Sequence, residues 1–292
     1  MALDSMQEIF DQVETKGIPF WQVVLETDVD ERQATTEASW EKMRMTWRAM
    51  LESVESYQAE QRSVSGLVGG DGGKMHEYGK KGESLGGPYL QAVIATALQV
   101  GESNACMRKI VAAPTAGACG VLPAVLVPLY QEGRAEEEEI IRALYVSAGI
   151  GAVVGFRASI AGASGGCQAE IGTASAMAAG ALTALRGGND QQIGHAVAMA
   201  LKNLMGLVCD PVAGLVEVPC VKRNVVGAVN AITCADMAMA GVESKIPVDQ
   251  VIDCMGDVGR RMPVEFRETA LGGLAVTPFG LSVKEKMLNG EF

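Results

Sequence analysis

The stretch of residues 168–185, QAEIGTASAMAAGALTAL, is apolar on nearly every side of a helix. A helix without a polar face cannot lie at the surface and must be surrounded by other parts of the chain. Residues 190–207 have a similar character. Aromatic residues make up only 5% of the chain, so Ala, Val, Leu and Met must fill the core, which suits close helix packing. The sequence therefore predicts a mainly α fold built around buried helices.

Other segments also carry helical patterns. They are residues 90–112, 121–130, 136–156, 224–240 and 248–262. An apolar stripe at helical spacing in the N-terminal part predicts a core or partner-facing helix; it consists of Trp40, Met43, Trp47, Met50 and Val54. Ser5 and Glu8 fit a capping box at the start of the first helix. No convincing period-2 strand occurs, and Leu215 to Val218 is the best candidate for a short one.

Residues 66–88 hold nine glycines and predict an irregular loop, which is often functional or mobile at this length. Neither GxGxxG nor GxxxxGK[ST] occurs in it, so it resembles no phosphate loop. Lys74 and His76 lie in this loop and Lys202 lies on a helix, and we consider all three as candidate bases. We expect one helical domain with glycine-rich functional loops, divided into a leader region (1–65) and a catalytic region (66–292).

The formal net charge of −11 argues against a nucleic-acid partner, because no basic face is available to neutralise phosphates. The acidic run from Glu136 to Glu139 indicates a solvated first helical turn. The apolar stretch from Ala143 to Phe156 is too short to span a bilayer of about 30 Å, so a buried helix is expected and no membrane association. No secretory signal precedes the helices, and the seven cysteines lack disulfide spacing. These features predict a cytoplasmic protein.

Three cysteines lie in segments that contain glycine or proline within two residues of the thiol, namely Cys167, Cys209 and Cys220. Cys167 follows a run of glycines in GASGGCQAE, just before the buried helix, where free backbone N–H groups stabilise a thiolate. Cys209 and Cys220 lie in proline-stiffened turns. Their spacing is neither that of a zinc site nor that of a ferredoxin. Two interpretations follow: distant loops gathered into one metal or cluster site, or three unrelated buried thiols.

Two further glycine-bearing turns precede helices and could hold a small carboxylate or amine. Thr115 lies in the first, APTAGACG, and Ser164 lies in the second, beside Cys167. We name both hydroxyls as candidate substrate contacts. Ordinary helix-end capping explains the same residues about as well.

Four strings in one order carry a family resemblance: APTAGACGVLPAVL, ASIAGASGGCQAEIGTASAMAA, LKNLMGLVCDPVAGLVEVPCVKRN and RETALGGLAVTP. They resemble the α chain of the iron–sulfur-dependent L-serine dehydratases. The resemblance implies that Cys167, Cys209 and Cys220 hold a [4Fe–4S] cluster with one iron left open as a Lewis acid for the serine hydroxyl. Loss of the α-proton and of water would then give an aminoacrylate, which yields pyruvate and ammonia. A pyridoxal phosphate site is not expected, since no Schiff-base lysine accompanies a phosphate cup.

The resemblance also implies a partner. Single-chain members of the family carry an added domain with an SSHT motif and a C-terminal cysteine, and neither occurs in this sequence. Both absences suit the two-subunit type, in which a β chain supplies the missing domain. Arg157 and Ala161 stand where the family usually has asparagine and serine, which places a charge near the cluster loop. Asn203 and Arg223 flank that loop and could orient cluster or substrate.

Two other functions remain open at this point. A cysteine desulfidase built on the same domain would release pyruvate, ammonia and sulfide from L-cysteine. A non-catalytic iron–sulfur sensor or scaffold subunit would hold a cluster without lyase activity.

Overall fold

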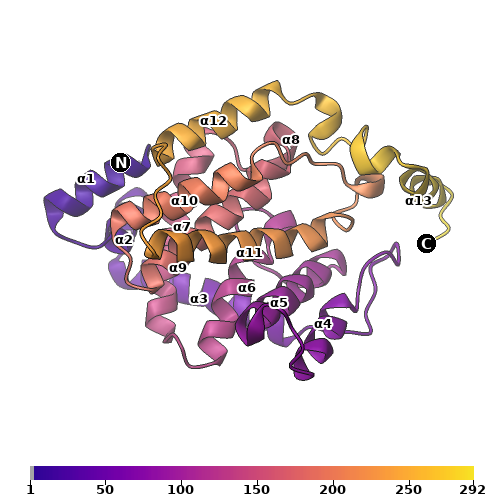
Figure 1. Cartoon of the computed structure of the whole chain (residues 1–292), viewed down its shortest axis with the longest axis horizontal. Helices are drawn as coiled ribbons and strands as arrows, with labels where there is room; N and C mark the ends of the chain where they lie inside the picture. The colour runs from indigo at the N-terminus through magenta and orange to yellow at the C-terminus, as the bar shows by residue number, and fades with distance from the viewer. Residues whose placement is uncertain (1–2) are drawn as a thin grey trace.

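The computed structural model describes residues 3–292, and within this range the chain forms thirteen α-helices and no strand (Figure 1). The helices are α1 (Met6–Lys16), α2 (Phe20–Arg32), α3 (Thr36–Glu55), α4 (Asp71–Lys80), α5 (Gly87–Ala105), α6 (Val121–Gln131), α7 (Glu137–Arg157), α8 (Gly162–Gly165), α9 (Thr173–Leu185), α10 (Asp190–Leu204), α11 (Cys220–Met239), α12 (Val248–Arg261) and α13 (Pro278–Leu288). Short helical turns lie between them: η1 (Ala116–Ala118), η2 (Gln168–Gly172), η3 (Val212–Gly214), η4 (Val264–Phe266) and η5 (Gly273–Val276). The predicted mainly α fold is confirmed.

Helix α9 is the centre of the molecule, as its all-round apolar sequence predicts. It packs against α6, α7, α10 and α11, and all but two of its residues are buried. Small side chains let the neighbouring helices approach closely: a Cβ added at Gly180 would lie 2.2 Å from Ile150 Cδ1 on α7. Helix α12 covers one side of this group, while α1 and α13 lie at opposite ends of the long axis (Figure 1).

The N-terminal helices share this core instead of standing apart from it. Trp47 and Met50 on α3 are fully or almost fully buried, which confirms the core alternative for the predicted stripe. Ser5 caps α1 as predicted, since its Oγ accepts from the Glu8 N–H at 3.0 Å. The reciprocal half of the capping box is wrong, because the Glu8 carboxylate accepts from the Asp4 N–H at 3.2 Å. The division at residue 65 stays a prediction.

Two local predictions are wrong. The glycine-rich segment is not irregular throughout, because residues 71–80 form α4, whose first N–H groups are capped by the distant carboxylate of Glu102. The residues from Leu215 to Val218 form no strand, because their backbone groups bond within a local turn: the Glu217 N–H donates to Leu215 O at 2.8 Å, and Val218 O accepts from the Val212 N–H at 2.9 Å. A single parallel bridge joins Cys209 to Arg267 instead.

Helix α7 is a buried helix, as predicted. Glu136 caps it through a capping box with Glu139, so the acidic run does form the first turn. By length and composition, α7 is the one helix among residues 3–292 that could cross a membrane. However, 61% of its apolar window is buried inside the protein, as expected for a core helix.

Candidate functional site

The three cysteines singled out in the sequence lie together. Cys167 lies between α8 and η2, Cys209 lies in the turn after α10, and Cys220 is the first residue of α11. Their exposed fractions are 3%, 2% and 9%, and none forms a disulfide. The Cys167 and Cys209 thiols lie close enough for each to shift the pKa of the other, and Cys220 is close enough to interact electrostatically with both. The fold thus gathers three distant thiols into one buried group, called the thiol centre below.

Gln168 fixes the position of Cys167. Its backbone N–H donates to Leu207 O at 3.0 Å, and its side-chain Oε1 accepts from the Gly206 N–H at 2.8 Å. Its Nε2 donates to Met255 O on α12 at 3.2 Å. One buried amide therefore joins the start of η2 to the turn that carries Cys209.

The segment after α12 holds Cys209 from the other side. The Cys209 N–H donates to Phe266 O at 2.8 Å, and the Glu268 N–H donates to Cys209 O at 2.9 Å. The neighbouring Asp210 accepts the Leu274 N–H at 2.8 Å through Oδ2. The string RETALGGLAVTP, quoted above for its resemblance, forms this wall of the site.

Asn224 on α11 joins Cys220 to the turn that contains Thr115. Its Oδ1 accepts from the Gly120 N–H at 2.8 Å, and its Nδ2 donates to Gly117 O at 2.8 Å and to Cys220 O at 3.0 Å. Asn224 is 1% exposed, so these bonds are shielded from water. The first glycine-bearing turn is thereby held against the thiol centre.

Arg223 supplies the positive charge of the centre. Its guanidinium donates to Val208 O at 2.8 Å and to Asp210 Oδ1 at 2.9 Å. The pKa of the Cys167 thiol is lowered, because the Cys209 thiol donates a hydrogen bond to it and Arg223 lies nearby. That shared proton and burial raise the pKa of Cys209, and burial raises the pKa of Cys220 to about 12. Of the three thiols in the metal-free centre, Cys167 is therefore the most acidic.

Two carboxylates that the sequence analysis missed face the same space. Oxygens of Glu170 and Glu268 and the Cys209 sulfur all lie within 4.8 Å of one another. Burial raises the pKa of Glu170. A Cβ at Gly162 would lie 2.7 Å from Glu170 Oε2 and 2.9 Å from Glu268 Oε2, so both carboxylates reach the backbone there. The sequence did contain a signal for these two glutamates, because they lie in the strings CQAE and RETA, which belong to the segments that carry the family resemblance.

The two predicted hydroxyls are placed differently. Thr115 lies beside Glu170 and lowers the pKa of that carboxyl, and its Oγ1 has no hydrogen-bond partner within the described chain. Its oxygen is shielded from solvent. Ser164 is exposed and lines a hollow between α8 and α12, together with Gln168 and Arg260. The structure therefore brings Thr115, but not Ser164, to the carboxylates of the site.

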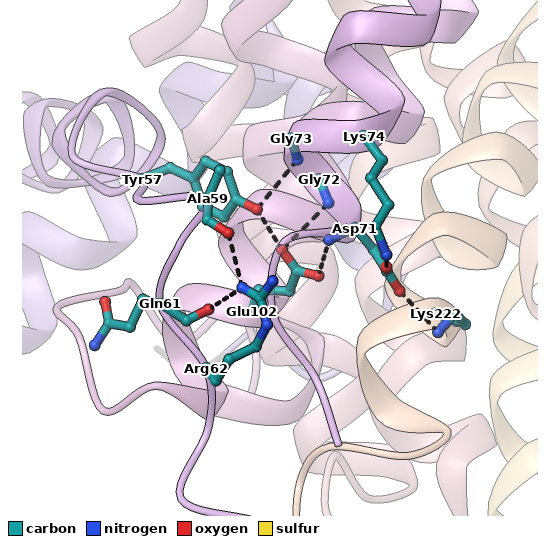
Figure 2. Close-up of polar contacts among 10 residues, drawn as sticks. All are labelled: Tyr57, Ala59, Gln61, Arg62, Asp71, Gly72, Gly73, Lys74, Glu102 and Lys222. Carbon is teal, nitrogen blue, oxygen red and sulfur yellow. Dashed lines mark hydrogen bonds and ion pairs between the residues drawn. The ribbon is translucent and has the colours of Figure 1, made fainter. Parts of the chain in front are cut away.

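The three candidate bases lie in other surroundings. Lys74 and His76 are exposed on α4, and Lys74 Nζ pairs with Asp71 at 2.9 Å (Figure 2). Lys202 Nζ donates to Ser244 O at 2.7 Å, next to the start of α12. None of the three is among the groups that interact with the thiol centre in the described part of the chain.

Two further residues expected near the cluster loop also point elsewhere. Asn203 Nδ2 donates to Asn230 Oδ1 at 2.7 Å, so it does not face the thiol centre. Arg157 pairs with Asp253 at 2.6 Å and donates to Asp4 O at 3.2 Å. Asp253 on α12 neutralises the charge of Arg157, and the hydrogen bond to Asp4 O joins the end of α7 to the N-terminal segment.

An all-helical fold with a buried three-thiol centre, one guanidinium and two facing carboxylates defines a protein equipped to hold a metal group beside a small polar ligand. Comparison with known proteins identifies the family of the chain. The family model described as serine dehydratase alpha chain matches residues 15–275, and the chain belongs to that family.

Individual relatives cover almost the whole chain. It is 43% identical over 286 residues to the probable L-serine dehydratase alpha chain of Bacillus subtilis (strain 168), with 98% of this chain and 95% of that one covered. It is 41% identical over 291 residues to the L-serine dehydratase alpha chain of Peptoniphilus asaccharolyticus, with 98% of each covered. An L-serine dehydratase of Escherichia coli (strain K12) is 45% identical over 182 residues, which are 62% of this chain and 40% of that protein.

Proposed function

We propose that this chain is the catalytic α subunit of an L-serine ammonia-lyase that converts L-serine to pyruvate and ammonia with a [4Fe–4S] cluster. The observation that carries the proposal is the thiol centre: three buried, unpaired cysteines from three separate segments, in a chain of this family. Thiolates are the usual ligands of iron–sulfur clusters.

The residues of the centre fit such a group. Cys167, Cys209 and Cys220 would hold the cluster, and three ligands would leave one iron without a protein thiolate. The Arg223 guanidinium offsets part of the negative charge of the thiolates, since it already lowers the pKa of Cys167. Thr115 Oγ1 is shielded from solvent and has no hydrogen-bond partner within residues 3–292, so it is free to bind a ligand. When bound, the cluster would supply a Lewis acid for the substrate hydroxyl.

The chain's own side chains would bind the rest of L-serine. Glu170 and Glu268 form no ion pair with a lysine or arginine within residues 3–292, although their carboxylates face each other. Two facing carboxylates repel, and a cation between them removes that repulsion. We assign this place to the α-ammonium group of serine. Thr115 would hydrogen bond to the substrate beside it.

The remaining parts of the activity are assigned to a second subunit. Among residues 3–292, the groups that shift the pKa values of the three thiols include no lysine or histidine, which supports a base supplied by a β chain. The match to 40% of the Escherichia coli relative shows that more chain accompanies this domain there. Seven unpaired cysteines suit a reducing cytoplasm, which is part of the proposal.

The test is anaerobic reconstitution of the chain with iron and sulfide, with and without a β chain, followed by assay of pyruvate formation from L-serine. Replacing any one of Cys167, Cys209 and Cys220 by alanine should abolish bound iron and activity, while Cys254→Ala, at an exposed cysteine, should keep both. Full activity of any of the first three variants would contradict the ligand assignment.

The same assay separates the alternatives. Faster pyruvate and sulfide release from L-cysteine than pyruvate release from L-serine would identify a desulfidase. Bound iron without lyase activity, even with the β chain, would identify a sensor or scaffold subunit.

A further inference from the structure

Glu217 is a buried carboxylate in the turn between Cys209 and Cys220, with 6% of its surface exposed. Within residues 3–292 its side chain forms no ion pair with a basic residue and accepts hydrogen bonds only from serine hydroxyls. A buried anion is costly unless several donors satisfy it. Glu217 therefore needs these hydroxyls to stay in place.

The donors are Ser63 and Ser65, more than 150 residues away in sequence. Ser63 Oγ donates to Glu217 Oε2 at 2.8 Å, and Ser65 Oγ donates a short hydrogen bond to the same oxygen. Each hydroxyl also accepts a backbone N–H, from Val68 at 3.4 Å and from Leu67 at 3.1 Å. Residues 63–68, called the serine turn below, thus close around the carboxylate.

A second buried carboxylate anchors the elements on both sides of the serine turn. Figure 2 shows Glu102, which accepts from Tyr57 Oη at 2.6 Å, from the Asp71 N–H at 2.8 Å and from the Gly72 N–H at 3.2 Å. Tyr57 precedes the serine turn and Asp71 begins α4 after it. Glu102 therefore holds the chain on both sides of the serine turn, and Glu217 holds the turn itself. These contacts make the serine turn a rigid support for Glu217.

The backbone of Glu217 leads directly into α11. Its carbonyl accepts the Val221 N–H at 3.0 Å, and its own N–H donates to Leu215 O at 2.8 Å. Cys220 is the first residue of α11, so the place of Glu217 determines where that helix starts. We propose that Glu217 is a positioning residue, which through Ser63 and Ser65 directs the Cys220 thiol toward Cys167 and Cys209. Only the role of Cys220 as a metal ligand rests on the proposed function.

The test uses the full metal-free chain and measures the rate at which iodoacetamide alkylates Cys220, by mass spectrometry. Cys119, which is fully buried, is the internal reference. Glu217→Gln keeps the shape but removes the charge, and Ser65→Ala removes one donor. Each should speed alkylation of Cys220 about fivefold, since a charge-assisted hydrogen bond is lost. Ser65→Thr keeps the hydroxyl, so Cys220 should be alkylated at the wild-type rate in this variant.

Ser39→Ala is the matched control, because Ser39 is also buried and its hydroxyl also donates to a carboxylate, that of Asp28, but it lies on α3, away from the serine turn. It should lower the melting temperature and leave the Cys220 rate unchanged. The proposal fails if Cys220 is alkylated at the wild-type rate in Glu217→Gln and Ser65→Ala, or if Ser39→Ala speeds its alkylation as much as they do. Should Glu217→Gln not fold, Ser65→Ala against Ser65→Thr decides the question.

A second measurement connects this role to the cluster. After reconstitution, Glu217→Gln should lose iron in air faster than Ser39→Ala. A wild-type chain that takes up no iron and forms no pyruvate would refute the proposed function alone, because the alkylation comparison would still decide the role of Glu217.

Discussion

Arg223 and Asp210 form an ion pair at the edge of the thiol centre, with 2.9 Å between Nη2 and Oδ1 and side chains 14% and 5% exposed. The pair joins the first turns of α11 to the loop that carries Cys209. Because Arg223 also interacts with the Cys167 thiolate, one guanidinium links the stability of this loop to the charge of the centre.

Removing one partner of this ion pair should destabilise the metal-free chain strongly. Arg223→Met leaves the Asp210 carboxylate buried without its cation, and we expect a loss of about 3 kcal/mol in the free energy of unfolding. Urea denaturation measures it. The control is Arg261→Met, which breaks the exposed pair with Asp257 and should change stability by less than about 1 kcal/mol. Equal losses of unfolding free energy in the two variants would show that the buried pair of Arg223 and Asp210 matters no more than an exposed one.

The same variant should change the acidity of the thiol centre. Without the guanidinium, the pKa of Cys167 should rise, so that its thiolate appears at higher pH than in the wild-type chain. An ultraviolet titration of thiolate absorbance, compared between Arg223→Met and the double variant Arg223→Met/Cys167→Ser, isolates this group. An unchanged titration would show that Arg223 does not act on Cys167.

Glu170 should make the metal-free chain less stable as pH rises. Burial raises its pKa in the folded state, so the folded chain holds that proton more tightly than the unfolded chain. This contribution is present below the ordinary carboxyl pKa of 4.5 and is lost as pH rises through the raised value. Glu170→Gln should therefore gain stability relative to wild type at about pH 8 and not at about pH 4.

In the reconstituted enzyme the same substitution should lower activity, because an amide cannot pair with the ammonium group of serine. A higher KM for L-serine, with pyruvate formation as the readout, is the expected result. Glu170→Gln that matched wild type in both stability and KM would argue against both roles.

The core around α9 should reject even one added methyl group. Gly180→Ala places a Cβ against Ile150 Cδ1, Val197 and Ile193, and we expect a loss of about 1–3 kcal/mol. The double variant with Ile150→Val removes the colliding methyl and should recover part of this loss. Gly155→Ala on α7 has space for its Cβ and should be neutral or stabilising by up to about 1 kcal/mol. Thermal or urea unfolding of the four chains tests this.

Substituting Lys74 should leave the reaction intact. Its side chain is 76% exposed and pairs with Asp71, so Lys74→Ala should fold normally and keep pyruvate formation within about threefold of wild type. His76→Ala, also on the exposed face of α4, serves as a parallel variant. A loss of turnover without a loss of bound iron in either variant would restore that residue as a base.

The helices could be predicted from the sequence because their patterns are local. The buried character of residues 168–185 and the stripe at Trp47 and Met50 both follow from side-chain spacing, and the structure confirms them. The company of glycine and proline also drew attention to the three cysteines that the fold gathers. These patterns can be recognised without knowing which distant residues each segment contacts.

The errors occur where distant groups decide the local structure. Helix α4 forms in spite of its glycines because Glu102, some 30 residues later, caps its N-terminus. The residues around Glu217 turn instead of extending because their backbone groups bond to one another, while the Glu217 side chain is held by Ser63 and Ser65. Glu170 and Glu268 become a pair only when two segments nearly 100 residues apart meet at Cys209.

The five-residue π-helical turn η2, which directly follows Cys167, makes the site sensitive to chain length. A π turn holds one more residue than an α turn. Deleting a single residue there would leave a regular α-helix and rotate Cys167 by about 100° about the axis of α9. Among related sequences, this short stretch should tolerate substitutions far more readily than insertions or deletions, because the number of residues sets the direction in which Cys167 points.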